Sequence, residues 1–423
     1  MGKKNKGKPV KILDQALETL RPTTEQVAEA KKIITEAISK VNKNARPAKT
    51  IVGGSGAKNT FLRGEFDVDL FVLYPYKKFA SRSAEISDKL EVGIKKAFPG
   101  YERIHGSRDY FRAKFKGIQF EIIPILDIKK SSDAVNITDV SPLHSKWVLK
   151  KSTKGMNDQI RLMKAFCKGS GVYGAESYIR GFSGYVCEIL TIHYGSFTKV
   201  LKASKKWLPG TVIDTMKLLK GKPAFSVLNK SKIQSPLIII DPVQSDRNAA
   251  AALDMEAFER FRKKAVAFSK KPTTEYFERK FLGEKEIIKK YPRATVLKVT
   301  PIDGKEDVAG SSLYKTFQYL EQKTEKSGFK LKDSDWEWDK KNHAYFWFIP
   351  KKEPLDPEEI KAGPPIKLEE HAKTFKKLYT KAEVKRGRLY AKVPRTYTFL
   401  KAFYNDLKND PLIVKRTKDI EII

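Results

Sequence analysis

The stretch GGSGAKNTFLRGEFDVDLFVL, residues 53–73, joins a glycine-rich segment with a lysine to a run in which acidic and apolar residues alternate. The glycine-rich half does not match the P-loop pattern, because Lys58 follows Ala57 instead of glycine and precedes Asn59 instead of serine or threonine. It does not match the dinucleotide-binding pattern G-x-G-x-x-G either, since Asn59 stands at the last glycine position. A plain glycine turn would be the default interpretation if the acidic half were absent.

The acidic half of this stretch is expected to be a strand, so that Asp67 and Asp69 leave the same face of it. Their Cα atoms would lie roughly 7 Å apart, and two carboxylates at that distance repel each other unless a cation neutralises them. A third acid, Glu121, interrupts the apolar run IQFEIIP on another expected strand, where a charged side chain needs a partner. Three carboxylates on neighbouring strands are the protein part of a two-metal site for phosphoryl transfer, and oxygen ligands favour Mg²⁺.

The two halves together indicate a nucleotidyltransferase site. The turn around Gly54 and Ser55 would place backbone N–H groups and a hydroxyl on the β- and γ-phosphates of a nucleotide. The predicted reaction is attack of an RNA or sugar hydroxyl on the α-phosphate. A lone pair of acids on a strand is more often a solvated edge, and it is the preceding G-G-S and the third acid that favour the catalytic interpretation.

The charge of the chain indicates a polyanionic partner. Its 423 residues include 84 Lys and Arg against 50 Asp and Glu, a formal charge of +34. Nucleic acid is the simplest such partner, although a lysine-rich proteome or a heat-adapted surface would give the same composition. The two cysteines, Cys167 and Cys187, form no CxxC motif and fit a reducing cytoplasm. No apolar run approaches the roughly 20 residues of a membrane span, and the basic start, MGKKNKGKP, is expected to be a frayed arm.

The predicted elements divide the chain into three domains and give a multidomain α+β fold. Residues 1–150 combine strands and helices around one small sheet, with a hairpin that turns at Lys116 and Gly117. Residues 151–272 are mainly helical. Residues 273–423 follow a β-α-β-β order and form a second α+β domain.

Four local predictions accompany this division. A helix over residues 23–43 is expected to open at Thr24 and Gln26. In the last third, a helix is expected to be capped by Ser311 or Ser312. The segment KAGPPIK, residues 361–367, is predicted to be a loop, and RTYTFLKAFYNDLKN, residues 395–409, a closing helix.

The glycine-rich and acidic motifs of residues 53–73 resemble those of the DNA polymerase β-like nucleotidyltransferase superfamily. The pattern of that superfamily is G-[GS] followed after a spacer by [DE]-h-[DE]-h, where h is a hydrophobic residue. Within it, the chain resembles the archaeal, class I CCA-adding enzymes, which are tRNA nucleotidyltransferases. Besides the opening stretch, the motifs that carry this resemblance are FEIIP, DVSPLHSKW, RLMKAFCKGSGVYGAESYIRGFSGYVCEIL, YGSF and IIIDPVQSDRNAAAAL. The resemblance implies a polymerase β-like head, a helical neck, and a C-terminal body and tail.

By this resemblance, Asp67, Asp69 and Glu121 correspond to the metal-binding acids, and Glu121 departs from the aspartate more common in the family. The residues that match triphosphate, phosphate and ribose contacts are Gly54, Ser55, Lys58, Ser141, His144, Lys164 and Tyr173. Arg247 matches the arginine that, with tRNA backbone phosphate, reads the incoming base. Each residue alone has an ordinary structural interpretation, such as an ion pair with Asp246 for Arg247, and the joint order of the motifs favours the functional one.

The resemblance implies template-independent addition of CCA to the 3′ end of tRNA from CTP and ATP, in the cytoplasm, with two Mg²⁺ ions and release of pyrophosphate. The implied tRNA contacts are to the acceptor stem and T-arm, and the candidates for phosphate contact are Lys385, Arg386, Arg388, Arg395 and Lys401. A solvated basic face is the alternative for each of them. Other functions stay open at this point: a poly(A)- or poly(U)-type RNA nucleotidyltransferase, a sugar or antibiotic nucleotidyltransferase, and a non-catalytic RNA-binding protein on the same fold. So does assembly into a homodimer.

Overall fold

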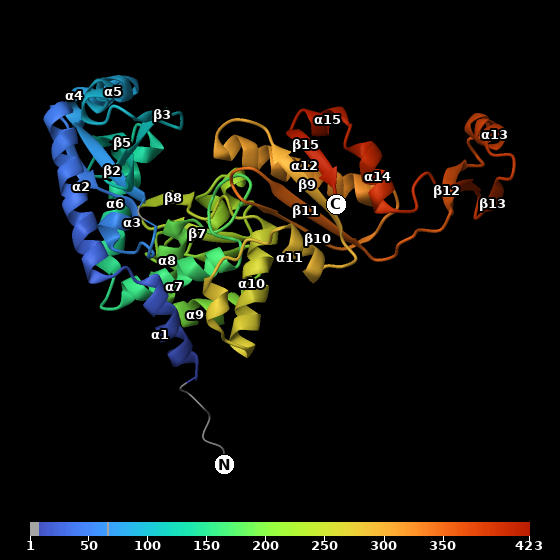
Figure 1. The fold of residues 1–423 in the computed structure, drawn as a ribbon, viewed down its shortest axis with the longest axis horizontal. Coiled ribbons are helices and arrows are strands. Elements are labelled where there is room, and N and C mark those ends of the chain that lie inside the picture. Colours follow the sequence, from blue (N-terminus) through green and yellow to red (C-terminus); the bar gives the residue numbers. More distant parts are fainter. Residues whose placement is uncertain (1–7, 66) are drawn as a thin grey trace, which may run out of the picture. The chain divides into compact units, whose positions relative to one another are not determined.

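The computed structural model describes residues 8–65 and 67–423 (Figure 1). The chain forms two compact units, Met1–Arg279 and Lys280–Ile423, which are described in turn. The basic arm expected at the N-terminus lies outside the described residues except for Lys8 and Pro9, with which helix α1 (Lys8–Leu20) begins. None of the described helices is long and apolar enough to cross a membrane.

A five-stranded mixed sheet organises the first part of the first unit. Its strand order is β1-β2-β5-β4-β3, with β2 and β5 parallel and the other neighbours antiparallel. The strands are β1 (Lys49–Val52), β2 (Asp67–Pro75), β3 (Glu102–Ile104), β4 (Tyr110–Phe115) and β5 (Ile118–Asp127). The hairpin predicted between β4 and β5 is confirmed, and it turns at Lys116 and Gly117 with φ of 48° and 83°, the pair of positive values that matches the twist of a hairpin.

Two helices, α2 (Thr24–Asn44) and α5 (Ile86–Ala97), pack against each other and against this sheet (Figure 1). The strand face that carries Val68 and Leu70 joins their apolar side chains in one buried core. Because side chains alternate along a strand, Asp67 and Asp69 lie on the opposite face. Helix α2 confirms the predicted helix, but its capping box pairs Thr23, not Thr24, with Gln26.

The rest of the first unit is mainly helical. Its longer helices are α6 (Ser141–Lys151), α7 (Met156–Gly169), α8 (Gly184–Tyr194), α9 (Phe197–Ser204) and α10 (Met255–Lys270). Their apolar faces meet in a core of aromatic rings, in which Phe166 lies 5.4, 5.7 and 5.8 Å from the rings of Phe197, Phe261 and Phe268. Helix α1, which the sequence did not predict, packs its apolar face into the same core.

A three-stranded sheet lies within this helical part, in the order β6-β7-β8. Its strands are β6 (Thr211–Ile213), β7 (Leu237–Asp241) and β8 (Gln244–Asn248). Every residue of β7 is buried, as expected for a central strand of apolar residues. The strand therefore carries its last residue, Asp241, into the protein interior.

The second unit contains two antiparallel sheets with helices beside them. The first has the order β10-β11-β9-β15, and the second the order β12-β14-β13. Their strands are β9 (Thr295–Pro301), β10 (Leu331–Trp338), β11 (Ala344–Pro350), β12 (Glu358–Pro365), β13 (Glu383–Lys385), β14 (Arg388–Pro394) and β15 (Thr417–Ile422). The helices are α11 (Glu284–Lys290), α12 (Glu306–Lys326), α13 (Glu369–Leu378), α14 (Leu400–Leu407) and α15 (Pro411–Val414). The predicted β-α-β-β order is present as β9, α12, β10 and β11.

Three local predictions for this unit are wrong. Helix α12 begins at Glu306 instead of near Ser311, with acidic residues in its first turn, where they interact favourably with the positive end of the helix dipole. The expected loop at residues 361–367 belongs largely to β12, an edge strand, and edge strands tolerate proline. Helix α14 does not close the chain, because β15 follows it and pairs with β9.

Candidate active site

Three acidic residues lie on neighbouring strands of the five-stranded sheet. Asp67 and Asp69 are on β2, and Glu121 is on β5. The parallel register places Asp69 directly beside Glu121. Val68 and Leu70, which alternate with the two aspartates, are 4% and 0% exposed. The core contacts of these two residues therefore fix the direction in which the acids leave the strand.

The carboxyl group of Asp69 is strongly affected by its surroundings. Burial, followed by the neighbouring Glu121 and then Asp67, raises the pKa of Asp69 to about 6, while Lys58 and Lys164 act in the opposite direction. The site thus concentrates negative charge, and two lysines lie near enough to offset part of it. A cation bound there would favour the ionised form of Asp69.

The glycine-rich segment comes very close to Asp69. Gly53 donates its backbone N–H to the carbonyl oxygen of Asp69 at 2.7 Å, which extends the pairing of β1 with β2. Gly54 has a φ of +53°, and a Cβ built on it would lie 1.6 Å from Oδ2 of Asp69. The predicted turn is in fact a short helix, α3 (Gly54–Lys58). A side chain at residue 54 is excluded both by its backbone conformation and by the Asp69 carboxylate.

The third acid, Glu121, has a basic partner that the sequence did not reveal. Arg112 of β4 faces Glu121 in the antiparallel register, and its Nη2 donates to the Glu121 carboxylate at 3.2 Å. Within residues 8–65 and 67–423, no three acidic, histidine or cysteine side chains form a ready-made metal-binding group. The carboxylate oxygens of Asp67, Asp69 and Glu121 are nevertheless the donors that Mg²⁺ prefers. Burial first, and then the charges of Glu121 and Asp67, raise the pKa of Asp69, and a bound cation would offset both effects.

Two of the predicted phosphate-binding residues meet on one buried carboxylate. Glu188 of α8 is 0% exposed; its Oε2 accepts from Nζ of Lys58 at 2.6 Å, and its Oε1 accepts from Nζ of Lys164 at 2.9 Å and from the Thr60 hydroxyl at 3.0 Å. Burial lowers the pKa of Lys58, and the charge of Glu188 opposes that effect. Burial alone would raise the pKa of Glu188, but Lys164 and Lys58 hold it below its ordinary value.

A second buried carboxylate joins two further predicted residues. Asp241, which is 0% exposed, accepts from Nη1 of Arg247 at 2.5 Å and lies 3.1 Å from Nε2 of His144. The ring of His144 stacks on Tyr185 with 4.2 Å between centroids, and the Tyr185 hydroxyl donates to Asp241 at 3.3 Å. Burial acts to raise the pKa of Asp241, but His144, the backbone N–H of Val243 and Arg247 together lower it.

Tyr173 lies beside the first of these two groups. Its backbone forms an isolated β-bridge with Phe182. A Cβ built on Gly184 would lie 2.9 Å from the Tyr173 hydroxyl and 3.8 Å from Nζ of Lys164. Gly184, the second glycine of the RGFSGY motif, therefore allows the start of α8 to approach both side chains. Ser55 of α3 and Ser141, the first residue of α6, are both half-buried.

Sequence reasoning missed Glu188 and Asp241, although the signal was present. Each is an acid within an apolar run, CEIL and LIIID respectively, which is the pattern that singled out Glu121. A buried acid requires a charged or hydrogen-bonding partner. Applied to these two runs, the same argument would have predicted two further carboxylate centres, but not which basic residues they bind.

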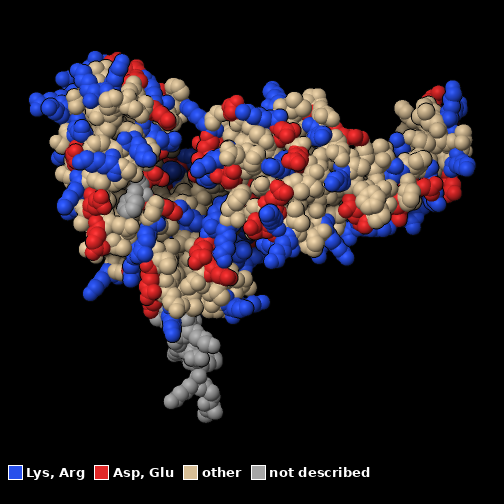
Figure 2. All heavy atoms as spheres, in the orientation of Figure 1, with Lys and Arg blue, Asp and Glu red and all other residues tan. Residues whose placement is uncertain are grey.

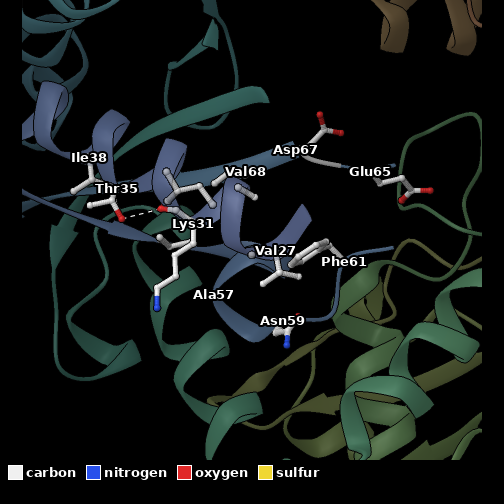
Figure 3. A pocket seen from close by; sticks show the side chains of 14 residues that line it. Val27, Lys31, Thr35, Ile38, Ala57, Asn59, Phe61, Glu65, Asp67 and Val68 are labelled. Carbon is white, nitrogen blue, oxygen red and sulfur yellow. Dashed lines mark hydrogen bonds between the residues drawn. The ribbon is translucent and has the colours of Figure 1, made fainter. Parts of the chain in front are cut away.

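A cavity of about 540 Å³ adjoins the acids on the side of α2. Its wall is mostly apolar and includes Val27 and Ile34 of α2 together with Val68 of β2. Figure 3 shows Asp67 at the rim, with its carboxylate pointing away from Val27. Asp67 is thus the acid of the site that lines this cavity, and its carboxylate lies at the rim.

The basic residues predicted to contact RNA lie in the second unit. Lys385, Arg386 and Arg388 are exposed at the tight turn between β13 and β14, and Lys401 is exposed on α14. Figure 2 shows Lys and Arg side chains spread over the displayed face, with acidic side chains among them. Within β13, Glu383 pairs with Lys385 at 3.2 Å.

Arg395 differs from these exposed residues because its guanidinium is engaged within the protein. It pairs with Glu359 at 2.9 Å and donates to the carbonyl oxygens of Ser327 and Asp356 at 3.2 Å each. These contacts tie the segment directly after β14 to the end of α12. A role of Arg395 in binding RNA stays a prediction.

Comparison with known proteins gives a consistent result. Residues 158–278 match the family model described as tRNA nucleotidyltransferase, second domain. The CCA-adding enzyme of Nanoarchaeum equitans is 33% identical over 93% of this chain and 96% of its own length. The CCA-adding enzymes of Methanocaldococcus jannaschii and Pyrococcus abyssi are 28% and 34% identical, over 95% and 77% of this chain and 91% and 74% of their own lengths.

Among solved structures, the chain is similar to a cytoplasmic RNA terminal U-transferase with a TM-score of 0.49 and 14% sequence identity, over 64% of this chain and 99% of the other. That likeness is too distant to support a conclusion about substrate or reaction. The full-length relatives share far more sequence, and they cover both units of the chain.

Proposed function

The chain belongs to the family of CCA-adding enzymes, and we propose that its reaction takes place on the acid-bearing face of β2 and β5. It is a nucleotidyltransferase that adds CCA to the 3′ end of tRNA. The observation that carries the proposed location is the register of Asp69 beside Glu121, with the Gly54 backbone against the Asp69 carboxylate. We expect the fold around it to be a polymerase β-like head over residues 1–150, followed by a helical neck over residues 151–272 and a body and tail over residues 273–423.

In this proposal, Asp67, Asp69 and Glu121 hold Mg²⁺ by their carboxylate oxygens. When bound, two such ions lower the pKa of an attacking hydroxyl and stabilise the charge on the leaving pyrophosphate. Asp69 must then be ionised, and the nearby Lys58 and Lys164 already favour its ionised form. Arg112 holds the Glu121 carboxylate beside Asp69, so the longer side chain of glutamate, where the family more often has aspartate, has a fixed position.

The triphosphate of CTP or ATP is proposed to lie between α3 and α7. The backbone around Gly54 and the hydroxyl of Ser55 would donate to its oxygens, and Lys58 and Lys164 would supply positive charge. Tyr173 lies next to Lys164 and can reach the same region. Together with Ser141 at the start of α6, these groups would contact the phosphates and the ribose. The base would be contacted by other residues.

Selection of the base is proposed to depend on Arg247 and His144, which share Asp241. Arg247 would read the incoming base together with backbone phosphate of the growing tRNA end, so that selection changes as the end lengthens. Phosphates of the acceptor stem and T-arm of tRNA would be contacted by the exposed residues Lys385, Arg386, Arg388 and Lys401. Such contacts position the RNA without reading its sequence. We expect the reaction to take place in the cytoplasm.

Replacement of Asp69 by asparagine tests this location. The variant keeps the shape of the side chain but removes a charge, and metal-assisted chemistry contributes several kcal/mol, so nucleotide addition should fall roughly 1,000-fold or more. Binding of tRNA, measured by filter retention, should persist. A matched control is Asp88→Asn, since the side chain of Asp88 is exposed and pairs with Arg103. Undiminished addition by the Asp69 variant would contradict the proposed site.

A further inference from the structure

Glu188 is a fully buried carboxylate that, together with its partners, joins three separate segments of the first unit. Lys58 is the last residue of α3, Lys164 lies in the middle of α7, and Glu188 itself is on α8. Thr60, also buried, donates its hydroxyl to Glu188 and accepts from Nζ of Lys164 at 2.9 Å. Both oxygens of Glu188 are therefore occupied, and the group links the segment that follows β1 to the helical part of the chain.

The two lysines could not occupy these positions without an acid between them. Both are largely buried, at 7% and 4% exposed, and each ammonium lies in the field of the other. Two buried like charges without a counter-charge separate, lose a proton or become solvated. Glu188 is the carboxylate that pairs with both, so it holds the ammonium groups side by side.

The same arrangement leaves Lys58 able to donate to an anion, while Lys164 contributes its positive charge. An ammonium has three N–H donors. Glu188 uses one donor of Lys58, whereas Lys164 donates to Glu188 and to the hydroxyl and carbonyl oxygens of Thr60. Two lysines and one glutamate carry a net charge of +1, and Lys58 is the last residue of α3, whose first residue, Gly54, lies against the Asp69 carboxylate. A triphosphate lying against the acids would meet this charge in a fixed place.

From these contacts we propose that Glu188 is a positioning residue for the nucleoside triphosphate: it fixes Lys58 so that its ammonium can donate to the phosphates, and it holds the charge of Lys164 beside it. The proposal rests on the proposed function, because it takes the triphosphate site from there. It assigns a role to a residue that itself touches neither substrate nor metal. Since the lysines would bind phosphates and not bases, loss of Glu188 should affect CTP and ATP equally.

The test is Glu188→Gln in the full chain, with steady-state addition of CTP to tRNA lacking CCA and of ATP to tRNA ending in CC. Glutamine keeps the size of the side chain and one acceptor but removes the charge that holds two cations. KM should rise roughly tenfold or more for both nucleotides, with a smaller change in kcat and an unchanged ratio of CTP to ATP use. Glu36→Gln is the matched control, because Glu36 makes an exposed ion pair with Lys116 on the outside of the sheet domain.

Two further measurements keep the outcome decisive. Thr60→Val removes one hydrogen bond of Glu188 and keeps its charge, so a smaller rise of KM for both nucleotides is expected even if the glutamine variant does not fold. Equilibrium binding of inorganic triphosphate reports on the lysines without catalysis. Weaker binding by the glutamine variant supports the proposal, even if the wild-type chain adds no CCA. Absence of CCA addition by the wild-type chain would overturn only the proposed function. Wild-type CCA addition with unchanged KM values and unchanged triphosphate binding in both variants would overturn the role of Glu188.

Discussion

Gly54 lies so close to Asp69 that a Cβ on residue 54 would fall 1.6 Å from the carboxylate oxygen Oδ2. This relationship ties the glycine-rich segment to the acids in space, as the sequence ties them in order. The backbone that is proposed to bind the triphosphate and the acid that is proposed to bind the metal are therefore in direct contact.

Gly54→Ala is the first prediction from this contact. The methyl group must displace either α3 or Asp69, and the positive φ of residue 54 adds strain. A displacement of about 1 Å at reacting groups lowers a rate roughly 100-fold, so nucleotide addition by the folded protein should fall by that order, and the strain should also lower the melting temperature. Gly117→Ala serves as the control, because its Cβ would meet nothing within 4 Å and its φ is also positive. Equal losses in both variants would show that strain alone, and not the contact with Asp69, is responsible.

Asp241→Asn should alter the choice between CTP and ATP. Asparagine keeps the shape of the side chain but removes the charge that holds Arg247 and His144, so the proposed base-reading arginine loses its fixed position. We expect the preference for C or A at each step to relax roughly tenfold, as it should in Arg247→Ala. Competition between the two nucleotides on tRNA ending in C and in CC measures the effect.

Arg262→Ala is a suitable control for Arg247→Ala, because Arg262 pairs with Glu259 on α10, away from the predicted site residues. Unchanged selectivity in both Asp241→Asn and Arg247→Ala would rule out the proposed reading of the base by Arg247.

The backbone amide hydrogens of the N-terminal helix α1 should exchange faster in acid. Arg21 donates to Asp158 of α7 through two bonds of 3.0 and 2.6 Å; burial acts to raise the pKa of Asp158, but Arg21 and Arg161 hold it below its ordinary value. A depressed carboxyl pKa stabilises the folded state above the unfolded pKa of about 3.9 and loses this contribution as the pH falls through the folded pKa. Hydrogen exchange of α1 should therefore increase below about pH 4.

Asp158→Asn should raise the exchange of α1 at neutral pH, and it should weaken the acid dependence. Arg82→Ala, which breaks an exposed ion pair with Glu85, should leave α1 protected. An acid dependence of the same size in Asp158→Asn as in the wild type would mean that other groups hold this helix.

Much of the first sheet could be predicted because its residues alternate. Val68 and Leu70 are apolar, Asp67 and Asp69 are acidic, and the period of two in a strand forces the pairs onto opposite faces. The Lys116-Gly117 turn likewise follows from local chemistry, since Gly117 adopts a positive φ easily. The predicted cap of α12 lay too far along the chain, because Ser311 resembles an N-cap locally, whereas the helix already begins at Glu306, with acidic residues in its first turn.

The partners of the charged residues could not be predicted. Lys58 and Glu188 are 130 residues apart, and no local pattern specifies which of many basic residues will meet a buried acid. The local alternative for Arg247 was an ion pair with the adjacent Asp246; its partner is Asp241, whose carboxylate is buried at the end of β7. Its expected contact with the incoming base and tRNA backbone phosphate stays a prediction. Long-range electrostatic pairing becomes visible only in the folded chain.

The central claim is that this chain adds CCA to tRNA, and the most direct measurement uses three radiolabelled tRNA transcripts that end before CCA, after C and after CC. Each is incubated with the protein and Mg²⁺ in the presence of CTP, ATP or both. The account predicts that C is added to the first two transcripts, that ATP is accepted only after CC, and that addition stops at CCA. Long A or U tails, addition of C alone, or no reaction with any of the three transcripts would contradict it.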